Sequence, residues 1–162
     1  MVRALVVTAS DGVTAGVRED ASGAALGDRL ATLGFAVDHA LVPDEVAAIQ
    51  EVLTSGAEDH DLIITTGGTG LTPRDVTPQA TRAVVDYEVP GLAEAMRAAG
   101  RSVTPHADLS RGVVGVLGRT LIINLPGSPK GALESLAAVE AVLDHALQTL
   151  AGPFDHGTGG SA

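Results

Sequence analysis

The chain has 162 residues, a length that predicts a single domain, and 45% of them are hydrophobic, enough to build a substantial core. The chain has 10 Lys and Arg residues and 20 Asp and Glu residues, which gives a net charge of −10. This charge has the wrong sign for a protein that neutralises nucleic-acid phosphates. The sequence has no Cys and no apolar run near the roughly 18 residues of a membrane span, so we expect a cytoplasmic protein without disulfides, nucleic-acid partners or membrane partners.

The first part of the chain alternates apolar runs rich in β-branched residues with segments of helical periodicity. A buried strand is predicted over residues 4–7, and further strands are predicted over residues 35–42, where Asp38 and His39 interrupt the apolar pattern, and over residues 61–66. The polar residues 10–16 are expected to form a loop. Ser22 is expected to cap a helix that ends at Gly34, and Asp44 opens the next helix. This order of strands and helices, with short connections, predicts an α/β fold in which crossover helices cover a parallel sheet.

The second part of the chain adds helices and a hairpin. A helix is expected from Pro78, with Thr77 as its cap, and another begins at Pro90 and ends at Gly100. Residues 112–116 and 120–124 flank a short turn, which predicts a hairpin that adds an antiparallel edge strand to the mostly parallel sheet.

The end of the chain divides into a helix and a tail. A helix over about residues 131–150 carries an apolar stripe, which indicates a core or oligomer face. Its members are Leu136, Val139, Leu143, Ala146, Leu147 and Leu150. Residues 152–162 contain almost nothing to bury, so we assign residues 1–151 to one domain and expect a flexible C-terminal tail.

A glycine-rich loop gives the strongest local signal for a binding site. Ligands of open α/β sheets bind beyond the carboxyl ends of the strands, and residues 65–70, which follow a predicted strand, contain three Gly and three Thr. Such a loop lets backbone N–H groups approach a phosphate or a pterin, although a tight turn with positive φ angles would also need these glycines. The loop lacks the dinucleotide-binding spacing, because Pro73 stands three residues beyond Gly70, and no Lys completes a Walker A loop.

Four polar residues near the predicted strand ends have both a structural and a functional interpretation. Asp44 precedes a periodic apolar segment, as a helix N-cap does, whereas Asp75 has no obvious structural role because Thr77 already supplies a cap. Asn124 closes an apolar strand, so its amide needs partners in a turn or in a ligand. Lys130, the single lysine, is either solvated or placed to meet a phosphate. The histidines lack zinc-site spacing, and no Gly-x-Ser-x-Gly hydrolase motif is present.

Three segments carry a resemblance to a known family: TTGGTGLTPRDVTP at residues 65–78, VPDE at 42–45 and LIINLPGS at 121–128. Together they resemble the MogA/MoaB family of molybdenum-cofactor biosynthesis proteins and the gephyrin G domain. The resemblance implies a three-layer α/β/α fold, a homotrimer and a domain over residues 1–151 that binds molybdopterin. In the catalytic branch it implies Mg²⁺-dependent adenylylation of molybdopterin by ATP, with release of pyrophosphate, and hand-over to a molybdate-insertion protein. The alternatives are a non-catalytic molybdopterin carrier of the same family and an unrelated regulatory or dinucleotide-binding domain.

The resemblance also implies which residues form the site. Asp44 and Asp75 match the carboxylates on which catalysis rests, and two carboxylates beside phosphates fit a Mg²⁺ ion between them. The other matching positions, expected to bind molybdopterin or nucleotide, are Ser10, Asp11, Thr66, Gly67, Gly68, Thr69, Gly70, Ser110, Asn124, Pro126, Gly127 and Ser128. Arg74 and Lys130 join them because a chain of net charge −10 needs local cations to hold polyanions. Gln79 stands where the family more often has an acidic residue.

Overall fold

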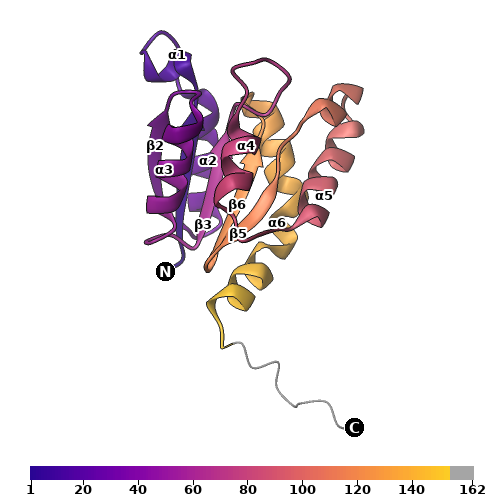
Figure 1. Cartoon of the computed structure of the whole chain (residues 1–162). Helices are drawn as coiled ribbons and strands as arrows, with labels where there is room; N and C mark the ends of the chain where they lie inside the picture. The colour runs from indigo at the N-terminus through magenta and orange to yellow at the C-terminus, as the bar shows by residue number, and fades with distance from the viewer. Residues whose placement is uncertain (154–162) are drawn as a thin grey trace.

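The computed structural model describes residues 1–153 and contains a six-stranded sheet with the order β2-β1-β3-β6-β5-β4 (Figure 1). Four strands run parallel: β1 (Arg3–Ala9), β2 (Ala36–Val42), β3 (Leu62–Thr66) and β6 (Thr120–Leu125). The antiparallel part is formed by β5 (Val114–Leu117), which pairs with β6, and β4 (Tyr87–Glu88), which pairs with β5. The mostly parallel sheet with an antiparallel edge hairpin is therefore confirmed. Apart from its first two residues, the predicted tail lies outside the described residues.

Helices cover both faces of this sheet, which confirms the three-layer α/β fold (Figure 1). The helices are α1 (Asp11–Thr14), α2 (Ala21–Thr32), α3 (Val46–Gly56), α4 (Thr77–Val84), α5 (Pro90–Arg101) and α6 (Pro129–Ala151), with a 3₁₀ turn at Pro105–Leu109. One core cluster joins α2, α5 and α6 to the sheet, and the other joins α3 and α4 to the opposite face. None of the described helices combines the length and hydropathy that a bilayer crossing requires.

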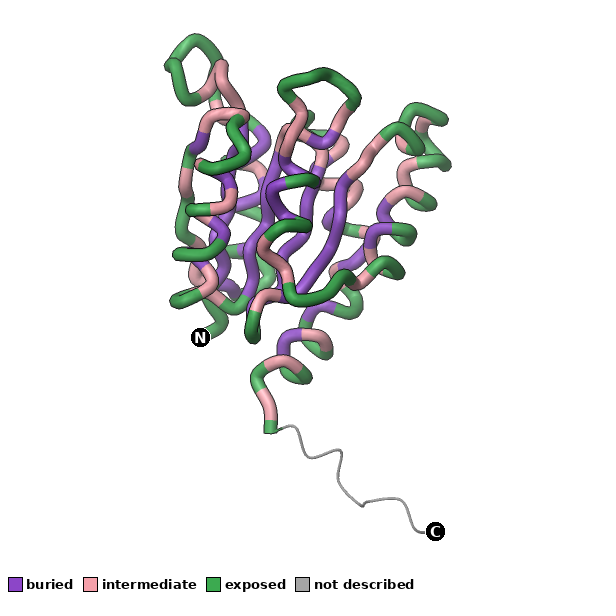
Figure 2. The backbone as a smooth tube through the Cα atoms, viewed as in Figure 1, coloured by how far each residue is buried: buried purple, intermediate pink, exposed green. Residues whose placement is uncertain are grey.

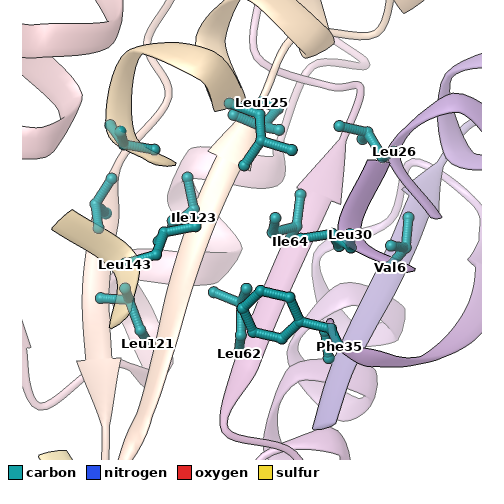
Figure 3. Packing of buried hydrophobic residues seen from close by; sticks show 14 of the residues in the cluster. Val6, Leu26, Leu30, Phe35, Leu62, Ile64, Leu121, Ile123, Leu125 and Leu143 are labelled. Carbon is teal, nitrogen blue, oxygen red and sulfur yellow. The ribbon is translucent and has the colours of Figure 1, made fainter. Parts of the chain in front are cut away.

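The central strands are mostly apolar because both of their faces are covered. In β3 and β6 every residue is buried, whereas the edge strand β2 is largely half-buried or exposed (Figure 2). Figure 3 shows Leu30 of α2 beside Ile64 of β3, and Leu143 of α6 beside Ile123 of β6. The apolar stripe of α6 faces this core, since Leu136, Val139, Leu143 and Leu147 are all buried.

Several local expectations about the helix starts and the smaller elements are wrong. The segment predicted as a loop after β1 contains the one-turn helix α1, and the short edge strand β4 carries no pattern in the sequence. Ser22 does not cap α2: the cap is Asp20, whose carboxylate accepts hydrogen bonds from the Gly23 N–H at 3.0 Å and from the Thr8 hydroxyl at 2.9 Å. Asp20 therefore starts the helix earlier, because its carboxylate serves the helix and the adjacent strand β1 together.

Candidate functional site

Two cavities lie at the carboxyl ends of the parallel strands, on either side of the glycine loop. The first, here called the aspartate cavity, measures about 660 Å³ and is lined by Ser10, Asp44, Thr66, Gly67, Gly68, Asp75 and Gly127 among others. The second cavity measures about 320 Å³, and its lining includes Thr69, Gly70, Ser110, Asn124, Pro126 and Ser128. The same two loops, which follow β3 and β6, contribute residues to both cavities. The structure thus brings most of the sequence-predicted site residues to one sheet edge, at the top of the molecule in Figure 1.

Asp44 is held by Asp11 rather than by the helix that follows it. The Asp11 N–H donates to Asp44 Oδ2 at 3.1 Å, and the Asp44 N–H donates back to Asp11 Oδ1 at 3.0 Å. The N-cap of α3 is Glu45, and its side chain makes no capping hydrogen bond. The N-cap interpretation of Asp44 is therefore wrong, because its carboxylate bonds to a backbone group of the first loop, 33 residues away in sequence.

The surroundings of the Asp44 carboxylate disfavour its negative charge. Its Oδ1 atom is buried and has no hydrogen-bond partner in the described part of the chain. Burial, joined by the negative charges of Asp11 and Asp75, raises the pKa of Asp44 above its ordinary value, and the Asp11 N–H offsets part of this effect. A buried acceptor without a partner is costly, so this oxygen is a ready ligand for a cation.

Arg74 forms an ion pair with Asp11, the residue that bonds to Asp44. Its guanidinium donates from Nε to Asp11 Oδ2 at 2.9 Å and from Nη2 to Asp11 Oδ1 at 3.0 Å. The Asp44 backbone N–H foremost, and the hydrogen bond and charge of Arg74 after it, hold the pKa of Asp11 below its ordinary value. Arg74 thus links the loop before α4 to the start of α1, and neither Asp11 nor Arg74 lines the two cavities.

The glycine loop approaches its neighbours too closely for other side chains. Gly67 and Gly68 have φ angles of 97° and 69°, in the left-handed region that favours glycine. A Cβ on Gly68 would overlap Thr77 Oγ1 and lie 3.3 Å from Asp44 Oδ1. The sequence suggested that Thr77 caps α4, but the cap residue is Val76. The Thr77 hydroxyl donates instead to Gly67 O at 2.9 Å. The threonine therefore fixes the loop instead of the helix.

Asp75 has a structural role that the sequence did not indicate. Its Oδ2 accepts a hydrogen bond from the Thr72 N–H at 2.9 Å, and its own N–H donates to Thr72 O at 3.0 Å. These two bonds close the turn that places the carboxylate in the aspartate cavity.

The remaining predicted residues differ in how they relate to the cavities. Lys130 is 79% exposed, lies 3.9 Å from Glu134 and lines neither cavity. Two arginines that sequence reasoning missed do line them: Arg18 lines the aspartate cavity, and Arg97 lines the second cavity while donating to Gly112 O at 3.0 Å. Neither arginine lies in a motif, so only a systematic search for cations around the predicted loops would have found them.

Asn124 has a protein partner for each of its polar atoms. Its side chain is almost completely buried, its Nδ2 donates to the hydroxyls of Thr65 and Thr81 at 3.0 Å each, and its Oδ1 accepts from the Val113 N–H at 3.2 Å. The interpretation of Asn124 as a structural amide therefore has direct support, although the residue also borders the second cavity.

We expect the Asn124→Ala substitution to lower the free energy of unfolding by about 3 kcal/mol, because the buried Val113 N–H and the Thr65 hydroxyl lose the amide that bonds to them. The Thr81 hydroxyl also loses this amide but keeps its bond to Thr77 O. Urea unfolding followed by circular dichroism measures this loss. Gln148→Ala, which removes an exposed amide from α6, is the matched control and should change the stability by less than about 0.5 kcal/mol. A loss for Asn124→Ala as small as that of the control would contradict the structural role.

The donor set at the aspartate cavity suits a magnesium ion. Within residues 1–153 no group of three or more His, Asp or Glu side chains is placed to hold a metal. Mg²⁺ usually keeps several waters and takes one or two carboxylates together with phosphate oxygens of a substrate. Asp44, with its unpartnered buried oxygen, and Asp75 in the same cavity meet that requirement.

Comparisons with known proteins identify the family of this chain. Residues 5–145 match the family described as "Probable molybdopterin binding domain". The molybdopterin adenylyltransferase of Helicobacter pylori is 37% identical over 92% of this chain and 88% of its own length. Gephyrin of Dictyostelium discoideum is 38% identical over 88% of this chain, which spans 21% of that protein. The molybdopterin biosynthesis enzyme MoaB of Thermus thermophilus is 53% identical, with a TM-score of 0.84 over 93% of this chain and 96% of that one. The chain therefore belongs to the molybdopterin-binding domain family of molybdenum-cofactor biosynthesis proteins.

Proposed function

We propose that this protein is a molybdopterin adenylyltransferase, which transfers AMP from ATP to molybdopterin and releases pyrophosphate in the presence of Mg²⁺. The observation that carries the proposal is the buried, unpartnered Asp44 Oδ1 in a cavity that Asp75 also lines. The similarity to molybdopterin adenylyltransferases over most of the chain supports the same activity.

In this reaction a phosphate oxygen of molybdopterin attacks the α-phosphorus of ATP, and the bond from that phosphorus to pyrophosphate breaks. Asp44 and Asp75 would hold Mg²⁺, which supplies neutralisation of the phosphate charge when it is bound. The glycine loop offers an approach free of side chains at Gly67 and Gly68, where backbone groups orient a phosphate. The second cavity, which adjoins the same loop at Thr69 and Gly70, is the place we assign to the pterin.

Local cations offset the overall charge of the chain at this site. Arg18 lines the aspartate cavity, and Arg74 bonds to Asp11, which bonds in turn to Asp44, so both arginines can meet phosphate oxygens despite the net charge of −10. Arg74 would exchange part of its contact with Asp11 for a phosphate. Lys130, Ser110 and Ser128 stay proposed ligand residues, of which the two serines line the second cavity.

The second candidate function is a non-catalytic molybdopterin carrier of the same family. The match of residues 5–145 to a family described as a probable molybdopterin binding domain supports it, because that description concerns binding and not transfer. We also propose a cytoplasmic homotrimer that hands its product to a molybdate-insertion protein. Longer relatives such as gephyrin, of which this domain is about a fifth, support the hand-over.

Pyrophosphate release decides between the two candidates. The purified chain is incubated with molybdopterin, ATP and Mg²⁺, and pyrophosphate is followed by a coupled assay, with a parallel reaction containing excess EDTA. We expect stoichiometric or catalytic release that depends on molybdopterin and disappears with EDTA. Binding of molybdopterin, detected by its fluorescence, without any pyrophosphate would establish the carrier instead. Sedimentation velocity at micromolar concentration tests the trimer in the same preparation.

A further inference from the structure

Arg111 forms hydrogen bonds to both ends of the loop formed by residues 69–75, which borders the two cavities. Its Nε donates to Gly70 O at 2.8 Å, its Nη2 to Asp75 O at 2.7 Å and its Nη1 to Gln79 Oε1 at 3.2 Å. Its backbone N–H also donates to Thr69 O at 2.9 Å. The residue is half-buried between the 3₁₀ turn and β5, and it lines neither cavity.

The partners of this guanidinium are all uncharged. Within residues 1–153 no carboxylate forms an ion pair with Arg111, although the chain has 20 acidic residues. Its contacts therefore do not serve to neutralise a negative side chain. A planar guanidinium presents N–H groups in a rigid fork, so the two backbone carbonyls of Gly70 and Asp75 define its position and it defines theirs. The exposed Gln79 side chain adds the third contact. The ammonium group of a lysine, a single point at the end of a flexible stem, cannot reach all three.

The segment that Arg111 holds belongs to both cavities. Thr69 and Gly70, at one end, line the second cavity, and Asp75, at the other end, lines the aspartate cavity. We propose that Arg111 is a positioning residue, which fixes the Asp75 carboxylate relative to the second cavity so that the two bound substrates meet in register. Gln79 completes the set of acceptors from the first turn of α4. This inference rests on the proposed adenylyltransferase function.

A positioning role predicts a specific kinetic pattern. Because Arg111 lines neither cavity, its loss should leave the binding of each substrate nearly intact and disturb their alignment. Misplacement of a reacting group by about 1 Å can cost on the order of 10²-fold in rate. We therefore expect Arg111→Met to lower kcat at least tenfold, while the KM values for ATP and molybdopterin stay within about threefold of wild type.

The experiment compares Arg111→Met, Arg111→Lys and Arg82→Met in the full chain. Arg82 on α4 is the matched control, because its exposed guanidinium has a single long contact of 3.5 Å with Glu88. Arg111→Lys keeps the charge and most of the stem, so it decides the question if Arg111→Met does not fold. We expect both Arg111 variants to lose kcat and the control to stay within about twofold of wild type. Wild-type kcat in folded Arg111→Lys would overturn the inference.

A second measurement does not depend on turnover. Amide hydrogen exchange of Thr72 and Asp75, whose N–H groups close the loop, reports whether the loop is held. We expect at least tenfold faster exchange at these two amides in the Arg111 variants, with unchanged exchange in α6. If wild-type protein releases no pyrophosphate, the proposed function fails, and the exchange result still decides whether Arg111 holds the loop. Unchanged exchange at both amides would overturn the inference.

Discussion

Replacing Asp44 with Asn is expected to lower the rate of pyrophosphate release on the order of 10²-fold or more, while molybdopterin still binds. The substitution removes one negative charge from the cavity that Asp75 also lines, and with it the anionic character of the buried, unpartnered Oδ1. The amide oxygen of Asn can still accept the hydrogen bond from the Asp11 N–H, so the local fold should persist. Single-turnover assays and molybdopterin fluorescence measure the two effects separately.

The same substitution should leave the protein equally stable or more stable at neutral pH. Burial raises the pKa of Asp44 in the folded state above the ordinary value of 3.8, so the folded protein binds more protons than the unfolded chain between these two values. The contribution of Asp44 to the free energy of unfolding therefore falls as the pH rises from its unfolded-state pKa to its folded-state pKa. Asp44→Asn removes this loss of stability. The lowered pKa of Asp11, which makes the protein more stable as the pH rises, persists because its main cause is the hydrogen bond from the Asp44 backbone N–H.

A surface carboxylate provides the control for both measurements. Asp144→Asn removes the same charge from an exposed position on α6 and should change neither the rate nor the pH dependence of unfolding appreciably. Urea unfolding between pH 4 and pH 7 compares the three proteins. Wild-type turnover in Asp44→Asn would exclude a catalytic role for Asp44 and favour the carrier function.

Replacing Gly68 with Ala is expected to impair both stability and activity. The positive φ angle of 69° at Gly68 costs a non-glycine residue about 1–3 kcal/mol. The new methyl group would also overlap Thr77 Oγ1, and relief of that overlap costs roughly 1–3 kcal/mol more. Because the methyl group also approaches Asp44 Oδ1, we expect activity to fall at least 10²-fold at temperatures where the variant remains folded.

Gly118 separates the two causes of this effect. Its φ angle is 60°, but an added Cβ there would have no neighbour within 4 Å, so Gly118→Ala adds backbone strain without a clash. Differential scanning calorimetry and pyrophosphate release are measured on both variants. We expect Gly118→Ala to be destabilised and fully active. Equal destabilisation of the two variants, with activity retained in both, would mean that the glycine loop needs only its turn geometry and not the close approach to Asp44.

Local patterns were sufficient for the main elements of the fold. The apolar, β-branched runs of β1, β3 and β6 were sufficient to predict strands, and these strands are largely or wholly buried because both faces of a parallel sheet are covered. Helix starts were less predictable. Asp20 caps α2 where the sequence favours Ser22, and both the cap expected at Thr77 and the cap interpretation of Asp44 are wrong, since a polar side chain before a helix can equally bond to another part of the chain.

The sequence by itself determined the α/β class, the strand ends at which a ligand would lie and the glycine-threonine loop, because each depends on residues adjacent in the chain. Only the tertiary structure decided what the polar groups do. Asn124 bonds to hydroxyls 59 and 43 residues away, and Arg111 bonds to acceptors between 32 and 41 residues away. Such bonds leave no periodicity in the sequence, because their geometry exists only after the strands and helices have packed.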